Sequence, residues 1–159
     1  MDPLEATFEI GVFAYIANSR DEILLARDAT RENRWTLPGG GVLPGELLTD
    51  AVCREVREEL NVQVVVDRLA GIFSQRKRPG IVALFDAHIV GGKPRPDNVE
   101  TSDCRFFSWT AIDRLREEIK PAQFSMIYQR KSSVVGDPIF GFFITPPARD
   151  SETAAVNIG

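Results

Sequence analysis

The feature that most constrains the fold of this chain is an amphipathic segment, residues 46–60, that follows directly on a glycine-rich loop. Leu48, Val52, Val56 and Leu60 recur at every fourth position, and this spacing predicts a helix with one apolar stripe. Such a stripe is stable in water only when other elements cover it. The segment is therefore expected to be a helix that packs on a sheet.

Segments rich in β-branched and aromatic residues lie on both sides of this helix. Residues 7–17 and 22–26 flank a polar turn, and they are predicted to pair as a β-hairpin. His88, the single histidine, falls within a later strand and is predicted to be structural. Strands around one strong helix, with helices late in the chain, indicate a mixed α/β (α+β) fold. Further strands are expected at 62–66, 70–73, 81–90 and 106–109, and further helices at 111–119 and 122–131.

The length and composition fit one domain. The chain has 159 residues, of which 43% are hydrophobic, and this supports one sizeable core. We expect that domain to occupy residues 1–144. Residues 145–159 lack the apolar density needed to pack and are expected to form a flexible C-terminal tail. Cys53 and Cys104 form no metal-type pair, so they are interpreted as reduced thiols.

The charge balance and the hydropathy argue against two classes of partner. Nineteen basic against 23 acidic residues give a net charge of -4, without the basic excess that favours nucleic-acid polymers. The apolar stretch 10–16 is too short to span a bilayer, and Asp2 and Glu5 stand where a signal peptide carries positive charge. The protein is therefore expected to be cytoplasmic and to bind neither nucleic-acid polymers nor membranes.

Three carboxylates on the predicted helix carry the chemistry. Glu55, Glu58 and Glu59 are spaced by three and four residues, so a helix brings them to one face, where they repel one another. Arg54 and Arg57 relieve little of this repulsion, because exposed ion pairs are weak. A hard divalent cation compensates such a cluster, since Mg²⁺ takes carboxylate, water and phosphate oxygens as ligands. Together with glycines that let the backbone approach a ligand closely, the cluster predicts a metal and phosphate site.

Residues 40–62 resemble the Nudix box: G, five residues, E, seven residues, R-E, an aliphatic residue, any residue, E-E, any residue, G and an aliphatic residue. Asn61 stands where the family usually has its second glycine. Asparagine is the next best residue after glycine for the left-handed cap expected there, so the metal site is untouched. The segment 35–40 is similar to what commonly precedes the box. The order of elements over residues 5–135 resembles the α/β/α sandwich of the family, with its mixed β-sheet.

The resemblance implies a role for each residue of the box. Glu55, Glu58 and Glu59 would hold one or more Mg²⁺ ions, for which Mn²⁺ can substitute, with the Gly39 carbonyl as a backbone ligand. Arg54 would orient a glutamate of the cluster.

The resemblance also implies two roles for acids outside this cluster. Glu46 would support the junction between loop and helix through a polar contact. A later loop acid often completes the metal site or supplies the base, and Glu100 is the first candidate and Asp103 the second.

The reaction implied by the resemblance is attack of water on a phosphorus atom of a P–O–P linkage, with Glu55 or Glu100 accepting the proton. Arg54 and Glu58 complete the expected catalytic set. The substrate would be a nucleoside diphosphate linked to another group, such as ADP-ribose or a nucleotide-sugar. Arg76 and Arg78, with Lys77 between them, follow a predicted strand and are candidates for binding its phosphate or ribose; a solvated turn is the alternative.

Three other functions are compatible with parts of this pattern. The box does not distinguish a hydrolase of nucleoside diphosphate compounds from a nucleoside triphosphate pyrophosphohydrolase, because both use the same metal site. A nucleotide-sensing domain without catalysis would be expected to lose acids of the box, and none is lost here. Transfer of water to a sugar carbon goes with an altered box. The sequence leaves the oligomeric state open, and a homodimer is compatible with it.

Overall fold

The computed structural model describes residues 7–74, 79–133 and 139–142, the last for their backbone alone. The elements, in chain order, are β1 (Glu9–Tyr15), β2 (Ile23–Asp28), β3 (Trp35–Thr36), β4 (Gly39–Gly41), α1 (Leu48–Leu60), β5 (Gln63–Ser74), β6 (Gly80–Gly91), β7 (Thr101–Phe107), α2 (Trp109–Arg114), the 3₁₀ turn η1 (Arg116–Glu118), α3 (Pro121–Ser132) and β8 (Ile139–Phe142). The expected C-terminal tail, 145–159, lies outside the described residues.

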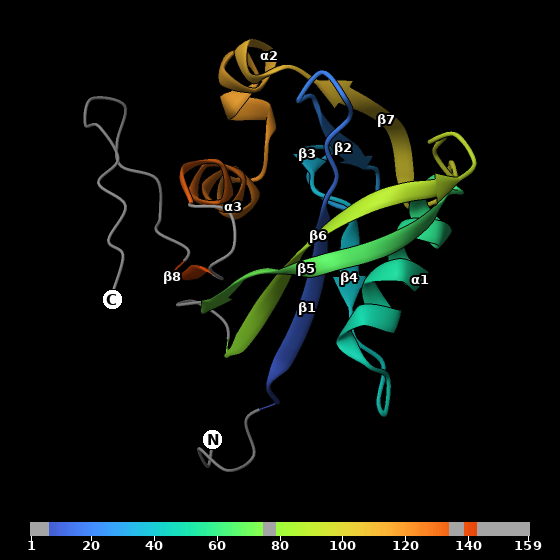
Figure 1. Ribbon diagram of the computed structural model, residues 1–159, viewed down its shortest axis with the longest axis vertical. Helices are drawn as coiled ribbons and strands as arrows, with labels where there is room; N and C mark the ends of the chain where they lie inside the picture. Colours follow the sequence, from blue (N-terminus) through green and yellow to red (C-terminus); the bar gives the residue numbers. More distant parts are fainter. Residues whose placement is uncertain (1–6, 75–78, 134–138, 143–159) are drawn as a thin grey trace.

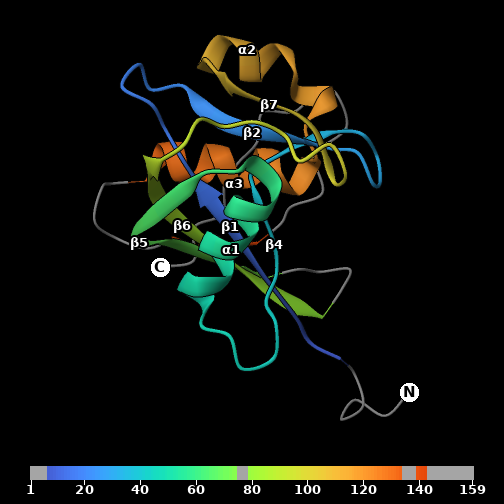
Figure 2. The same cartoon turned by 90° about the vertical axis from the view of Figure 1, so that its right-hand side faces the viewer.

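The strands form two sheets that lie between helices. The larger sheet has the order β4-β1-β6-β5-β8 and is mixed, because β1 runs parallel to β6 but antiparallel to β4. The smaller sheet has the order β3-β2-β7 and is antiparallel. Figure 1 shows α1 and α3 on opposite sides of the strands, and Figure 2 shows α1 in front of them. The predicted α/β/α sandwich with a mixed sheet is confirmed, although β8 is not among the expected strands.

The hairpin predicted for the first two strands is wrong. An isolated bridge joins Ala17 to Ile23, and the backbone N–H of Leu24 donates to the Ile16 carbonyl, but the strands then separate. Strand β1 enters the larger sheet and β2 the smaller one. The physical reason is that β2 is buried on both faces from Ile23 to Ala26, so it packs between two core clusters and pairs with β3 and β7.

Helix α1 buries the predicted apolar stripe, although it begins at Leu48. The turn before it is closed by the backbone N–H of Glu46 on the Leu43 carbonyl, so the helix starts after that turn. Its buried residues are Ala51, Val52, Val56 and Leu60. Asn61 ends the helix with a φ of 57°, in the left-handed region, and its N–H donates to a carbonyl of the last turn. The prediction that Asn61 replaces glycine as the helix cap is confirmed.

Several elements differ in extent from their predictions. The strands expected before and after residues 67–69 form one continuous strand, β5, whose pairing with β6 is interrupted by bulges. Trp109, expected to end a strand, begins α2, because the Ser108 side chain caps that helix by accepting a hydrogen bond from the N–H of Ala111. The late helix expected at 111–119 is divided into α2 and η1.

Two core clusters hold the layers together. One lies between α1 and the larger sheet and includes Val52, Val56 and Phe85. The other includes Phe73 and Leu84 of the sheet together with residues of α2 and α3. In the part of the chain that the structure describes, no helix is both long and apolar enough to cross a membrane.

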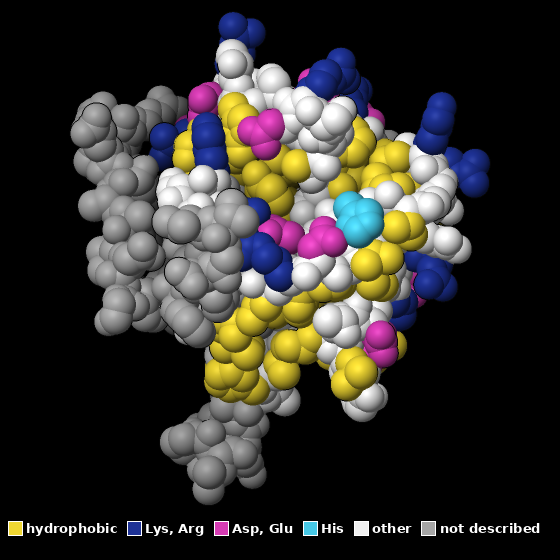
Figure 3. Space-filling model, viewed as in Figure 1, with side chains coloured by type: hydrophobic (Ala, Val, Ile, Leu, Met, Phe, Trp, Pro, Cys, Tyr) yellow, Lys and Arg dark blue, Asp and Glu magenta, His cyan; other side chains and the backbone are white. Residues whose placement is uncertain are grey.

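His88 lies on the molecular surface, where Figure 3 shows it in cyan beside an acidic side chain. Its Nδ1 atom is 2.8 Å from a carboxylate oxygen of Asp67, and about half of each side chain is exposed. Neither residue lines the cavity described below. The position of His88 within strand β6 agrees with a structural interpretation of this residue.

Candidate active site

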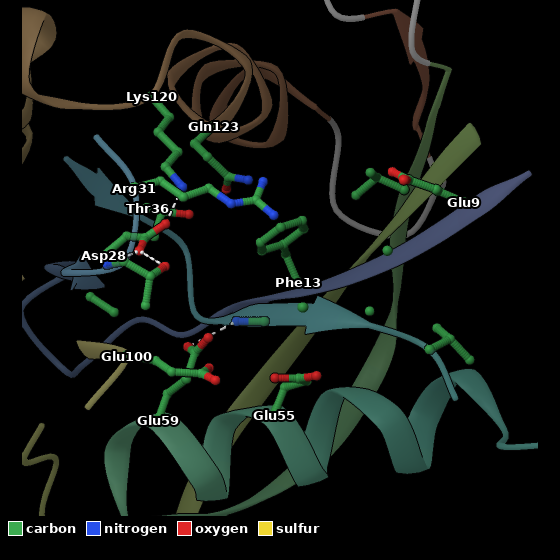
Figure 4. Close-up of a pocket in the computed structure, with 18 of the residues that line it drawn as sticks. Glu9, Phe13, Asp28, Arg31, Thr36, Glu55, Glu59, Glu100, Lys120 and Gln123 are labelled. Carbon is green, nitrogen blue, oxygen red and sulfur yellow. Dashed lines mark hydrogen bonds and ion pairs between the residues drawn. The ribbon is translucent and has the colours of Figure 1, made fainter. Parts of the chain in front are cut away.

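A cavity of about 660 Å³ opens where β4 and α1 face the end of β2, the loop after it and the start of α3. Figure 4 shows Glu55 and Glu59 projecting into it from α1, with Glu100 beside them. Arg31, Lys120 and Gln123 approach from the opposite wall. The volume is in the range of small-molecule sites in proteins. The cavity therefore has one acidic wall and one wall rich in hydrogen-bond donors.

Glu59 is the most perturbed acid of this cavity. The pKa of its carboxyl is raised from 4.5 to about 8, mainly by burial and then by the charges of Glu55, Glu100 and Asp28. The backbone N–H of Gly39, which donates to the carboxylate at 3.2 Å, acts in the opposite direction but does not balance these effects. A positive charge bound at this point would remove the imbalance.

Glu55 lies against the glycine loop. A Cβ atom added at Gly40 would come within 2.6 Å of the Glu55 carboxyl carbon, so only glycine leaves room for this carboxylate. Burial raises the pKa of Glu55; the neighbouring Arg54 lowers it, and the charges of Glu58 and Glu100 raise it again. The loop sequence and the position of this acid are thus matched to each other.

Arg54 joins the loop to the acids of the helix. Its guanidinium contacts Glu46 at 2.7 and 2.9 Å, Glu55 at 2.9 Å and Glu58 at 3.3 Å, and donates to the Gly41 carbonyl at 3.0 Å. These hydrogen bonds fix where the Glu55 carboxylate points.

Glu46 fixes the turn at the start of the helix. Besides binding Arg54, its carboxylate accepts the backbone N–H of Leu43. The hydrogen bond from Arg54, followed by that from Leu43, lowers the pKa of Glu46 to about 2. This carboxylate therefore stays charged at neutral pH.

The remaining predicted acids differ in position. Glu58 is 59% exposed, turns toward Arg54 and does not line the cavity. Glu100 lines it, on a loop whose backbone N–H groups donate to Asp97. Asp103 pairs with Arg105 instead and lies outside it.

Two further observations concern the residues predicted to hold a metal ion and those predicted to bind the substrate. Over the described ranges, no three His, Cys, Asp or Glu side chains converge in a group that could hold a metal ion as it stands. Arg76 and Arg78, expected to bind phosphate or ribose, lie outside the described residues.

The donor-rich wall was not anticipated from the sequence. Asp28 and Lys120 form an ion pair there. Burial opposes ionisation of Asp28, but hydrogen bonds from Lys120 and Thr30 outweigh it and lower the pKa to about 2. Arg31 is one of several charges in a loop and carries no distinguishing signal. Gln123 gives a weak sequence signal, since it is a polar residue at a buried position of an amphipathic helix.

The glycine loop gives a prediction that separates folding from catalysis. Gly40→Ala is expected to fold but to lower turnover about 100-fold, because its Cβ displaces the Glu55 carboxylate. Gly39→Ala is expected to unfold the protein, because its Cβ would lie 2.0 Å from the Val12 carbonyl oxygen. Gly41→Ala meets nothing within 4 Å and serves as the control for stability. Thermal unfolding and steady-state kinetics test this; an active Gly40→Ala variant would contradict it.

Comparison with known proteins identifies the class to which this fold and this site belong. A family model described as the NUDIX domain matches residues 7–129. The chain therefore belongs to the Nudix hydrolase family.

Individual relatives extend this assignment. A protein of Bacillus subtilis (strain 168), provisionally named an 8-oxo-dGTP diphosphatase, is 32% identical over 98 residues, which are 62% of this chain and 65% of the relative. Human diphosphoinositol polyphosphate phosphohydrolase 3-alpha is 42% identical over 59 residues, 37% of this chain and 36% of the relative. The chain thus spans between about a third and two thirds of these curated relatives.

A solved structure matches over more of the chain. The crystal structure of an ADP-ribose pyrophosphatase from Streptococcus suis superposes with a TM-score of 0.66 and 26% identity, over 84% of this chain and 99% of that one. The likeness in fold therefore covers nearly the whole of that protein.

Proposed function

We propose that this protein is a Mg²⁺-dependent hydrolase that cleaves the P–O–P bond of a nucleoside diphosphate linked to another group, such as ADP-ribose or a nucleotide-sugar. The observation that carries the proposal is the Glu59 carboxylate, set among three other acids with a single backbone N–H to compensate it. A solvated helix face has no reason to hold an acid in this way. The name of the Streptococcus suis relative supports the proposed substrate class.

The charges of the cavity fit a divalent cation. Five carboxylates line it, from Glu9, Asp28, Glu55, Glu59 and Glu100, against the two cationic side chains of Arg31 and Lys120. A diphosphate would be repelled by such a surface unless cations were bound with it. We propose Glu55, Glu58 and Glu59 as ligands of Mg²⁺ or Mn²⁺, with the Gly39 carbonyl as a backbone ligand. Carboxylates and carbonyl oxygens are the donors that hard cations prefer.

The side chains of the acidic wall would have separate roles in catalysis. Arg54 holds Glu55 in place, and Glu55 or Glu100 would accept the proton of the attacking water. Bound Mg²⁺ supplies neutralisation of phosphate oxygens and a lowered pKa for that water. The P–O bond to the leaving phosphate breaks as the new P–O bond forms, so a nucleoside monophosphate and a phosphorylated group are released.

A second candidate is a nucleoside triphosphate pyrophosphohydrolase that releases pyrophosphate. The relative from Bacillus subtilis favours it, since the name of that protein refers to a nucleoside triphosphate. Both candidates use the same acidic wall and differ only in which group follows the diphosphate.

A substrate panel tests the proposal. We expect the protein with Mg²⁺ to hydrolyse ADP-ribose or a nucleotide-sugar faster than nucleoside triphosphates. Chromatography of the phosphorylated products measures the rates. Glu55→Gln should lower turnover by at least about 1,000-fold, and chelation of the metal should abolish it. Glu32→Gln, an exposed acid outside the cavity, is the matched control. Nucleotide binding without turnover of any compound would instead support a sensor, and turnover that survives chelation would refute the metal role.

A further inference from the structure

The amide of Gln123 presents hydrogen-bond donors to the cavity. Its Oε1 atom accepts the backbone N–H of Leu37 at 3.3 Å, and this interaction fixes which end of the amide faces the strand. The Nε2 group is therefore the end left for the cavity, which Gln123 lines. In the described part of the chain, no hydrogen bond uses Nε2. Because the side chain is 6% exposed, the amide has little freedom to turn.

Arg31 adds more donors to the same wall. Figure 4 shows its side chain extending from the loop after β2 across the cavity, with its guanidinium on the side of Gln123 and Phe13. Among the residues that the structure describes, no hydrogen bond or ion pair involves Arg31. Its five N–H groups are thus available to a ligand.

The carboxylate of Asp28 on this wall is already occupied. Asp28 accepts two hydrogen bonds from Thr30 on one oxygen and the Lys120 ammonium on the other. The Thr36 hydroxyl donates to the Leu37 carbonyl, at 3.0 Å. Toward a ligand the amide and the guanidinium therefore offer donors, whereas the Thr30 and Thr36 hydroxyls, whose protons are already used, can accept. Phe13, which lines the cavity next to it, supplies an apolar ring against which a flat group can pack.

We propose that Arg31 and Gln123 contact the base edge that carries the C6 substituent of a purine or the C4 substituent of a pyrimidine, and select a carbonyl oxygen there, as in guanine or uracil, over an amino group, as in adenine or cytosine. This inference rests on the proposed function, and within its substrate class it favours guanosine and uridine diphosphate compounds, such as GDP- or UDP-linked sugars, over ADP-ribose. Guanine offers the adjacent acceptors O6 and N7, which a guanidinium binds in bidentate fashion, and uracil offers O4. Beside Arg31 and Gln123, the amino group of adenine or cytosine would face donors and remain unpaired, which is unfavourable in a cavity.

Binding measurements separate base recognition from phosphate recognition. The affinities of GDP, UDP, ADP, CDP and inorganic pyrophosphate are measured by calorimetry, with Ca²⁺ replacing Mg²⁺ so that turnover does not interfere. We expect the wild type to bind GDP and UDP about tenfold more tightly than ADP and CDP. Arg31→Ala should remove most of this preference and leave pyrophosphate binding within about twofold. Arg34→Ala, in the same loop but outside the cavity, is the control.

Gln123→Glu tests the polarity of the wall directly. This variant keeps an oxygen for the Leu37 N–H but replaces the donors that face the cavity by an acceptor, so the order of the four nucleotides should reverse. Gln129→Glu, on the same helix and bonded to Ser125, is the matched control, and thermal unfolding shows that both variants fold. The exposed Arg31 variant tests the inference even where a buried glutamate destabilises the protein.

The outcomes distinguish the inference from the proposed function. Equal affinity for all four nucleotides, in a protein that hydrolyses nucleotide diphosphates, overturns the inference alone. A loss of pyrophosphate affinity in Arg31→Ala as large as the loss for GDP makes Arg31 a phosphate contact and also overturns it. Absence of both nucleotide binding and turnover in the wild type overturns the proposed function itself.

Discussion

Replacing Glu59 by glutamine is expected to raise the melting temperature of the metal-free protein by roughly 5 to 10 °C at pH 8.5 and to abolish hydrolysis. The glutamine keeps the shape of the side chain and removes a charge that the fold opposes. Burial, then the charges of Glu55 and Glu100, raises the pKa of Glu59 from 4.5 to about 8. Ionising it in the folded state therefore costs a few kcal/mol, at about 1.4 kcal/mol per pKa unit.

The sign of this effect defines a pH window. Because the pKa of Glu59 is higher in the folded than in the unfolded state, the folded protein retains a proton that unfolding releases. The stability of the metal-free wild type should therefore fall as the pH rises from about 4.5 to about 8, and level off above that. The same curve for Glu59→Gln should fall less, because the raised pKa of Glu55 remains.

Thermal unfolding between about pH 5 and about pH 9, with and without Mg²⁺, tests both the fall in stability of the wild type and its reduction in Glu59→Gln. Mg²⁺ should stabilise the wild type, because it binds only the folded site, and should leave Glu59→Gln nearly unchanged. Glu117→Gln, which removes an acid outside the cavity, is the control. Equal or lower stability of Glu59→Gln at pH 8.5 would show that this carboxylate is not under electrostatic stress.

Local patterns were sufficient to predict that Glu55 and Glu59 lie on the acidic wall, but not that Glu58 turns away from it. The period of four residues locates α1, and the three glycines before it locate the loop, so Glu55 and Glu59 project toward that loop once the helix forms. Asn61 follows the same logic, because a helix end calls for a left-handed residue whatever it packs against. These features depend on neighbours in sequence, and a single sequence contains that information.

The donor-rich wall could not be predicted because it depends on contacts between distant residues. Gln123 meets the backbone of Leu37 only when α3 packs beside β3 and β4, and nothing local to either segment signals that contact. The hairpin failed for a related reason. The turn between the first two strands has the right residues, but burial of Ile23 to Ala26 on both faces draws β2 into a different sheet.

The second large effect concerns a cluster far from the cavity. Asp86 on β6 accepts hydrogen bonds from the Nε atoms of Arg68 and Arg130, both at 2.7 Å, and from Nη2 of Arg130 at 2.8 Å. The three side chains are 13 to 24% exposed. Arg130 also lies 5.0 Å above the ring of Tyr15. Asp86 is thus shared by two guanidinium groups, and the cluster already carries one excess positive charge.

Asp86→Ala is expected to lower the free energy of unfolding by about 3 to 5 kcal/mol, because it leaves two part-buried cations facing each other. For Arg68 the loss is compounded: both of its terminal nitrogens are already buried, and neither has a hydrogen-bond partner among the residues that the structure describes. Urea unfolding at pH 7 measures the effect. Asp103→Ala, which breaks the more exposed pair with Arg105, should cost less than about 1 kcal/mol.

Removing both charges separates the loss of a partner from the loss of packing. Asp86→Leu combined with Arg68→Met deletes one acid and one base, so Arg130 is the single cation left and the net charge of the cluster is unchanged. We expect this double variant to recover at least half of the stability lost in Asp86→Ala, since the penalty comes mainly from uncompensated charge. None of the three residues lines the cavity, so turnover below the melting temperature should stay near the wild-type value. A double variant no more stable than Asp86→Ala would mean instead that Asp86 acts by holding β5, β6 and α3 in register.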